Sequence, residues 1–118
     1  PGKDSYRHRT AGATEVLLAS RKRYALMHEL RAEDEPALDT LLAKLAPVDL
    51  VLIEGYKRDA HPKIEAFRAE TKNPLIATDD PTVKAIASDT PLDMDRPVFD
   101  LNDTVAIADF ILSEVGLV

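Results

Sequence analysis

The chain has 118 residues, 45% hydrophobic and 31% charged, a composition typical of one globular domain, which we expect to span residues 1–118. Its 15 basic and 21 acidic residues give a net charge of −6, which disfavours nonspecific nucleic-acid binding. The absence of cysteine excludes disulfides and is compatible with the cytoplasm, and no apolar run reaches the roughly 20 residues that span a bilayer, so we expect no membrane partner.

The first half of the chain predicts helices and strands in alternation. Residues 11–20 carry apolar side chains at the spacing of a short amphipathic helix, and residues 23–30 alternate as a strand does. Residues 34–46 predict a helix capped by Glu33 or Asp34. Residues 50–54 (LVLIE) form the most hydrophobic run of the chain, which predicts a strand covered on both faces, as in a parallel sheet.

The second half predicts four short strands and a closing helix. The strands are residues 63–69, 74–78, 83–88 and 97–101. One face of the first is expected to be wet, and residues 79–87 (DDPTVKAIA) could instead supply a helical turn. The helix begins after Asn102 or Asp103 and ends at Gly116. This alternation predicts an α/β fold whose sheet is mostly parallel, with an antiparallel hairpin.

Glu54 is the first candidate functional residue, because ligands of α/β sheets bind at the carboxyl ends of the strands. A hydrophobic strand that ends in an acid is the Walker B pattern, in which the carboxylate holds Mg²⁺ beside nucleotide phosphates. The pattern alone is weak, since many buried strands end in Asp or Glu. Its companion, the P-loop, is not found: Gly2 and Lys3 are followed by Asp4 where Ser or Thr is required.

Four segments in order, PGKDSYRHRTAGA, LIEGYKRDAHPKIEAFR, AIASDTPL and DLNDTVAIADFI, resemble consecutive landmarks of one family. This is the molybdopterin-guanine dinucleotide biosynthesis protein B (MobB) family, GTP-binding P-loop proteins of bacterial molybdenum-cofactor assembly. The resemblance covers essentially the whole chain. It implies a three-layer P-loop NTPase-like sheet that is truncated at its N-terminus, because the family's P-loop precedes the matched residues. It therefore also implies weak GTP binding by residues 1–118 alone, without the backbone cradle for the phosphates.

The resemblance also implies which residues form the site. Glu54 and Gly55 match the Walker-B-like end, with Glu54 as the catalytic residue and the ligand of Mg²⁺. Asp89 corresponds to an acid that would read the guanine base of GTP. The remaining residues are implied to lie near the nucleotide or an anionic pterin substrate: Lys3, Asp4, Ser5 and Arg7 in a loop, and Lys57, Arg58 and Lys63 beyond the strand.

Plainer interpretations remain open for several of these residues. Lys57, Arg58 and Lys63 could form only a solvated loop, and Lys63 could pair with Glu65 across a hairpin. The three histidines have no ligand spacing, and His28 is expected to pack within its strand.

The function that the resemblance implies is that of a GTP-binding accessory protein. With GTP and Mg²⁺ it would assist a MobA-type nucleotidyltransferase that joins GMP to molybdopterin, as a homodimer and at most a slow GTPase. Two alternatives stay open: a non-enzymatic adaptor or dimerisation domain that pairs through the 63–69 strand, and a P-loop small-molecule kinase, although no Arg-rich lid is apparent.

Overall fold

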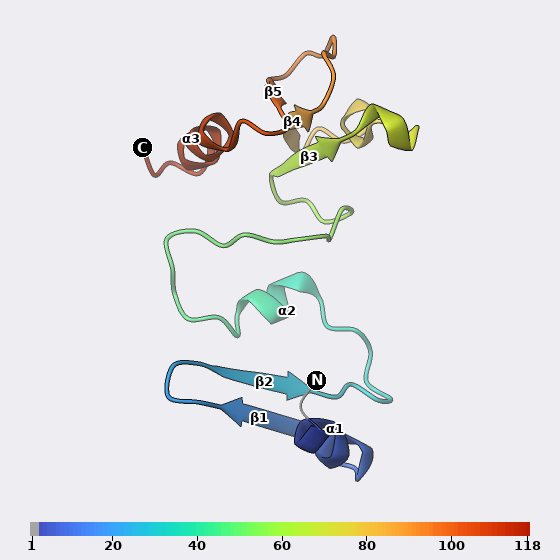
Figure 1. Ribbon diagram of the computed structural model, residues 1–118, viewed down its shortest axis with the longest axis vertical. Coiled ribbons are helices and arrows are strands. Elements are labelled where there is room, and N and C mark those ends of the chain that lie inside the picture. The colour runs from blue at the N-terminus through green and yellow to red at the C-terminus, as the bar shows by residue number, and fades with distance from the viewer. Residues whose placement is uncertain (1–2) are drawn as a thin grey trace. The chain divides into compact units, whose positions relative to one another are not determined.

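The computed structural model describes residues 3–118, which form two compact units that meet in sequence between Ala46 and Pro47 (Figure 1). We call them the N-terminal unit and the C-terminal unit. Each has its own sheet, antiparallel in the first and parallel in the second. The α/β class with a parallel sheet and an antiparallel hairpin is thereby confirmed, while the expectation of a single domain stays a prediction. No helix among the described residues is long and apolar enough to cross a membrane.

The N-terminal unit is built on a hairpin of β1 (Glu15–Ala19) and β2 (Tyr24–His28), preceded by helix α1 (Lys3–Thr10). The strand predicted at 23–30 is confirmed. The helix predicted at 11–20 is wrong, because the backbone of residues 15–19 pairs along its whole length with β2. Inter-strand pairing overrides a helical spacing that rested on few apolar positions.

Helix α2 (Leu38–Leu42) confirms only the middle of the helix predicted at 34–46. Its N-cap is Ala37, which has no side-chain oxygen to satisfy the first N–H groups. The predicted cap by Glu33 or Asp34 is wrong, and no residue of α2 is buried. Because α2 has neither a side-chain cap nor a buried face, few interactions stabilise a longer helix, and tight turns follow its last residue.

The C-terminal unit contains a three-stranded parallel sheet in the order β3-β4-β5. Its elements are β3 (Lys63–Phe67), η1 (Ala69–Thr71), η2 (Ile76–Thr78), β4 (Val83–Ser88), β5 (Val98–Asp100) and α3 (Thr104–Glu114). The strands predicted at 63–69, 83–88 and 97–101 are confirmed, and so is the closing helix. Asp103 is its N-cap, with a carboxylate that accepts from Ala106 N at 3.1 Å.

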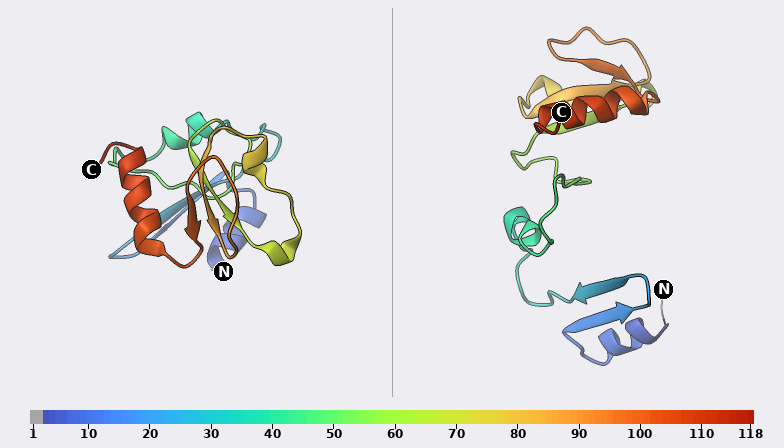
Figure 2. Two further views of the ribbon diagram at one scale, coloured as in Figure 1. Left: turned by 90° about the horizontal axis from the view of Figure 1, so that it is seen from above. Right: turned by 90° about the vertical axis from the view of Figure 1, so that its left-hand side faces the viewer.

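The core of this unit lies around the central strand β4, which is buried at every position except Lys84. Ile86 is fully buried and packs with Ala77 and Val83. Partly buried hydrophobic side chains surround this cluster: Phe67, Leu75, Leu92 and Met94. Helix α3 runs alongside the sheet (Figure 2), and the rings of Phe99 and Phe110 join it to β5 with centroids 5.4 Å apart. The middle strand of a parallel sheet is covered on both faces, which explains its apolar sequence.

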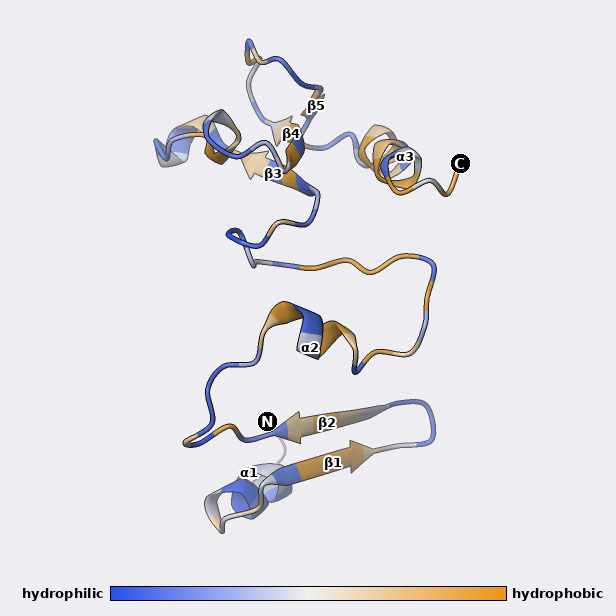
Figure 3. Cartoon of the chain, turned by 180° about the vertical axis from the view of Figure 1, so that it is seen from behind, coloured by the Kyte–Doolittle hydropathy of each residue, from blue (hydrophilic) through white to orange (hydrophobic). Residues whose placement is uncertain are grey.

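Two predicted strands of the C-terminal unit are wrong. Residues 74–78 contain the 3₁₀ turn η2, because the Glu65 carboxylate accepts from the backbone N–H groups of Ile76 and Ala77 and bends the chain there. Residues 50–54 form an irregular extended segment, with which no strand of the described chain pairs. Figure 3 shows the part of this segment before Glu54 as an apolar trace, and Leu52 is 75% exposed. The apolar run indicated a need for burial, but a strand also requires a neighbour for its backbone groups.

Candidate functional site

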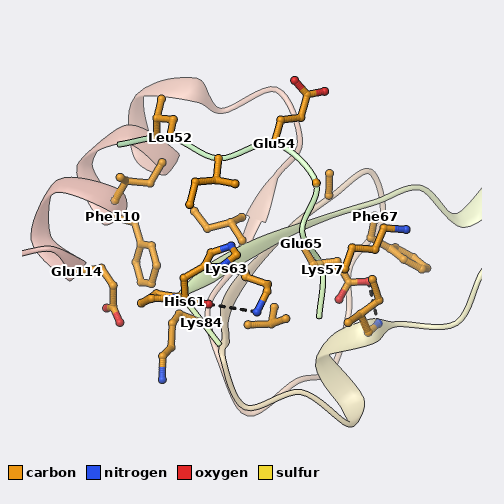
Figure 4. A pocket seen from close by; sticks show the side chains of 18 of the residues that line it. Leu52, Glu54, Lys57, His61, Lys63, Glu65, Phe67, Lys84, Phe110 and Glu114 are labelled. Atoms are coloured by element: carbon orange, nitrogen blue, oxygen red, sulfur yellow. Dashed lines mark hydrogen bonds between the residues drawn. The ribbon is translucent and has the colours of Figure 1, made fainter. Parts of the chain in front are cut away.

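A cavity of about 1040 Å³ lies in the C-terminal unit (Figure 4). It is lined by residues 50–55, by β3 and by the last turns of α3. Its apolar lining includes Ile64, Phe67, Phe110, Ile111 and Val115. Four of the predicted site residues also line it: Glu54, Gly55, Lys57 and Lys63. The structure therefore gathers these four around one cavity.

The chain turns sharply after Glu54. Gly55 has φ +83° and Tyr56 has φ +53°, so two successive residues lie in the left-handed region. A Cβ at Gly55 would meet nothing within 4 Å, so the backbone angle, not the space, favours glycine there. A tyrosine in this region costs about 1–2 kcal/mol. The local conformation at the predicted site is thus strained at Tyr56.

The Glu54 side chain is exposed and has no hydrogen bond or ion pair with a described residue. Figure 4 shows its carboxylate directed away from Lys63 and His61. No group of three or more His, Asp or Glu side chains among residues 3–118 could hold a metal ion. Mg²⁺ is commonly bound by one or two carboxylates together with waters and substrate phosphates. A single free carboxylate fits that donor set and would not suffice for a metal held by protein alone.

Lys63 is engaged inside the protein. Its ammonium donates to Thr82 Oγ1 at 2.6 Å, to His61 O at 3.2 Å and to Asp59 O, and the side chain is 11% exposed. An ammonium has three N–H donors, so all are used within these contacts. The alternative pairing of Lys63 with Glu65 is wrong, since Glu65 caps η2. In this structure Lys63 therefore joins the starts of β3 and β4.

Asp80 completes that polar cluster. Its Oδ1 accepts from Thr82 N at 2.9 Å and Thr82 Oγ1 at 2.5 Å, and its Oδ2 lies 3.7 Å from Lys63 Nζ. The Thr82 hydroxyl and amide, followed by the charge of Lys63, lower the pKa of the Asp80 carboxyl below its ordinary value. Arg96 closes the cluster by donating to the backbone oxygens of Asp80 and Val83. Sequence spacing could not have found this cluster, because its members come from three distant segments.

Asp89, the predicted guanine reader, directly follows β4. Its Oδ1 accepts from Ala69 N at 3.0 Å, and its own N–H donates to Phe67 O at 3.3 Å. One carboxylate oxygen is therefore committed to the turn after β3. Arg58 is exposed and does not line the cavity, and Lys57 is exposed at the cavity's margin, so a solvated-loop interpretation of this pair remains open.

The other predicted site residues lie in the N-terminal unit. Asp4, Ser5 and Arg7 stand on helix α1, so the loop implied for them is wrong. Asp4 lies in the first turn of α1, and Arg7 lies in its last turn. Lys3 begins the helix, and its side chain lies outside the described part.

His61 is a cavity residue that the sequence did not indicate. Its Nδ1 is buried and has no hydrogen-bond partner in the structure, while its backbone oxygen accepts from Lys63. A lone histidine without ligand spacing gives no signal in a sequence. Only the fold places it beside the cavity.

Comparisons with known proteins agree on one family. The model of the family "Molybdopterin guanine dinucleotide synthesis protein B" matches residues 1–89. The "Molybdopterin-guanine dinucleotide biosynthesis adapter protein" of Escherichia coli is 41% identical over 115 residues, 95% of this chain and 66% of that protein. The protein of the same name from Haemophilus influenzae is 41% identical over 112 residues, 93% of this chain and 61% of its own length.

A solved structure extends the similarity to the fold. The crystal structure of "molybdopterin-guanine biosynthesis protein B (mobB)" superposes with a TM-score of 0.75 at 26% identity, covering 96% of this chain and 74% of that one. The chain thus spans less than two thirds of the length of the two curated relatives that it matches.

Proposed function

The chain belongs to the MobB family, and from this membership we propose that it acts as an adapter in the biosynthesis of molybdopterin guanine dinucleotide. The observation that carries the proposal is the 41% identity to two relatives that bear the name of adapter protein, over more than nine tenths of this chain. That name favours an accessory role over the small-molecule kinase. The partner it would assist is a MobA-type nucleotidyltransferase, and the shared substrate is molybdopterin.

In this proposal GTP and Mg²⁺ are the ligands of the adapter. Three features of the C-terminal unit support it: the unpaired, exposed carboxylate of Glu54, the exposed cation of Lys57 at the same cavity, and Asp89 at the end of β4. Glu54 would hold Mg²⁺ together with phosphate oxygens and water. Lys57 would face the phosphates, and Asp89 would accept from guanine donors through the oxygen that Ala69 leaves free.

The structure divides the predicted cations into two classes, which sharpens the test. Lys57 has no protein partner in the described chain, whereas Lys63 has its three donors engaged. We therefore assign phosphate contact to Lys57 and a structural role to Lys63. Removing Lys57 should weaken nucleotide binding without loss of stability, and removing Lys63 should destabilise the C-terminal unit.

The test is a titration of GTP and ATP, with Mg²⁺, against this chain. We expect a preference for GTP over ATP. Glu54→Gln and Lys57→Ala should each reduce the affinity for GTP about tenfold or more. Glu70→Ala, an exposed acid in η1, is the matched control. Equal affinity for GTP and ATP, or no effect of Glu54→Gln, would contradict the assignment of these residues.

A specific observation also favours the homodimer of the sequence-based hypothesis. Strand β3 is an edge of its sheet, with β4 on one side and no strand of the described chain on the other. Free backbone groups on such an edge can pair with a second copy. Analytical ultracentrifugation over a concentration series tests this, and a monomer at every concentration would contradict it.

A further inference from the structure

His28 stands at the end of β2 and bridges two carboxylates from different segments. Its Nδ1 lies 2.9 Å from Glu15 Oε2, and its Nε2 lies 3.1 Å from Glu33 Oε1. Glu15 is the residue directly opposite His28 in the hairpin. Glu33 belongs to the turn that follows β2, so the ring of His28 joins this turn to strand β1.

Other contacts hold the same turn, residues 29–33, against the start of β1. Glu29 N donates to Thr14 O at 2.8 Å, and the Arg31 guanidinium donates to Ala13 O at 2.8 Å. Glu29 also pairs with Arg9 of α1, with Oε1 3.6 Å from Nε. Arg9 and Glu29 thus pair with each other, and Arg31 donates to the backbone. The titratable groups that face the His28 ring in the described chain are therefore Glu15 and Glu33.

An imidazole ring can donate from both nitrogens only when it is protonated. Neutral His28 keeps one N–H, and its other nitrogen presents a lone pair to a carboxylate. We propose that protonated His28 is a pH-sensitive clasp that holds the turn of residues 29–33 on the hairpin, and that its deprotonation releases Glu33.

The geometry decides which of the two contacts opens. The Glu15 contact is shorter, and the hairpin register fixes Glu15 opposite the ring. Glu33 is held at a longer distance, on a side chain that is 61% exposed at the end of a turn. Neutral His28 therefore keeps Nδ1–H toward Glu15, and Glu33 moves into solvent.

The pKa of His28 supports the same direction. The hydrogen bond with Glu15 raises it above 6.5, and the hydrogen bond with Glu33 raises it further. A group whose pKa is raised by folding contributes its full stability below 6.5 and loses it as the pH rises through the raised value. The clasp is therefore closed at acidic pH and opens on the alkaline side.

The experiment is an NMR titration of the whole chain from about pH 5 upward. The ring signals of His28 should titrate above 6.5, and the amide signals of residues 29–33 should shift with the same midpoint. In Glu33→Gln the midpoint of His28 should fall, and the coupled shift of these amides should be lost while the hairpin remains folded.

Glu35→Gln is the matched control, because it removes the same charge from an exposed position two residues later without a described contact to His28. It should leave both the midpoint and the amide shifts as they are. If Glu33→Gln and Glu35→Gln changed the His28 midpoint and the amide shifts equally, the cause would be the loss of a negative charge rather than the contact between His28 and Glu33. That result would overturn the proposal. So would a His28 titration that the amides of residues 29–33 do not follow.

Discussion

The two units of this chain stabilise their strands by different means. In the C-terminal unit the central strand β4 is buried, and Ala85 and Ile86 have no exposed surface. Burial of Val83 and of Ile86 contributes roughly 1.5–3 kcal/mol each, and the smaller alanine side chains contribute less. The parallel sheet of this unit therefore depends on packing.

In the N-terminal unit no described residue is as deeply buried as Val83, Ala85 or Ile86 of β4. Leu17 and Leu26, which oppose each other in the hairpin, are 62% and 58% exposed. The described contacts that shape this unit are backbone hydrogen bonds and the charged contacts of His28, Glu15 and Glu33. A two-stranded hairpin is at best marginally stable by itself. The C-terminal unit is therefore stabilised mainly by apolar burial, and the N-terminal unit mainly by polar contacts.

The largest expected effect comes from truncating the core. Ile86→Ala should destabilise the C-terminal unit by about 2–5 kcal/mol, because it removes a fully buried side chain and leaves a cavity. Leu26→Ala, a similar truncation in β2, should change the stability by only about 0.5 kcal/mol. Site-resolved hydrogen exchange of the β4 and β2 amides measures both. Similar losses in the two strands would contradict the contrast between the units.

The next effect tests the carboxylate that bends the chain at η2. Glu65→Ala should cost about 1–3 kcal/mol, because it leaves the N–H of fully buried Ala77 without its acceptor. Glu70→Ala, an exposed acid a few residues later, should be nearly neutral. Chemical denaturation of the two variants compares them. If Glu65→Ala unfolds no more readily than Glu70→Ala, the cap does not stabilise the turn.

The sequence predicted those parts of the fold whose signals are local. Alternation marked β3, short strands were predicted at the positions of β4 and β5, and Asn102 or Asp103 marked the start of α3 through the chemistry of a cap. It failed where the outcome depends on a distant partner. Residues 15–19 became a strand because β2 pairs with them, and residues 50–54 did not become one because no described strand does.

In the candidate site, too, the sequence predicted what depends on neighbouring residues and missed what depends on distant ones. The sequence could place Glu54, Gly55 and Lys57 together, because they are neighbours in the chain and surround one cavity. It could not predict that Lys63 is occupied by Thr82, which is 19 positions away, or that Asp89 accepts from Ala69. Whether a charged side chain is free for a ligand is decided by contacts that only the fold creates.

A smaller effect is expected at the N-cap of α3. Asp103→Ala should cost about 1 kcal/mol, because the N–H of Ala106 loses its acceptor at 3.1 Å. Asp103→Asn retains a side-chain oxygen and should cost much less. Thermal unfolding of the two variants distinguishes them. A cap that serves only through its charge would make the two variants equally unstable.

The smallest effects are the pH responses, which have opposite signs in the two units. The lowered pKa of Asp80 means that its contacts stabilise the C-terminal unit above about pH 3.8 and are lost as the pH falls through the lowered value. The raised pKa of His28 means that its contacts stabilise the N-terminal unit below 6.5 and are lost as the pH rises. Hydrogen exchange at both extremes should therefore show acid loosening residues 80–82 and alkali loosening residues 29–33. Asp80→Asn should flatten only the acid response and Glu33→Gln only the alkaline one, because each removes the titrating contact of one unit. A variant that altered both responses would mean that the two units do not titrate independently.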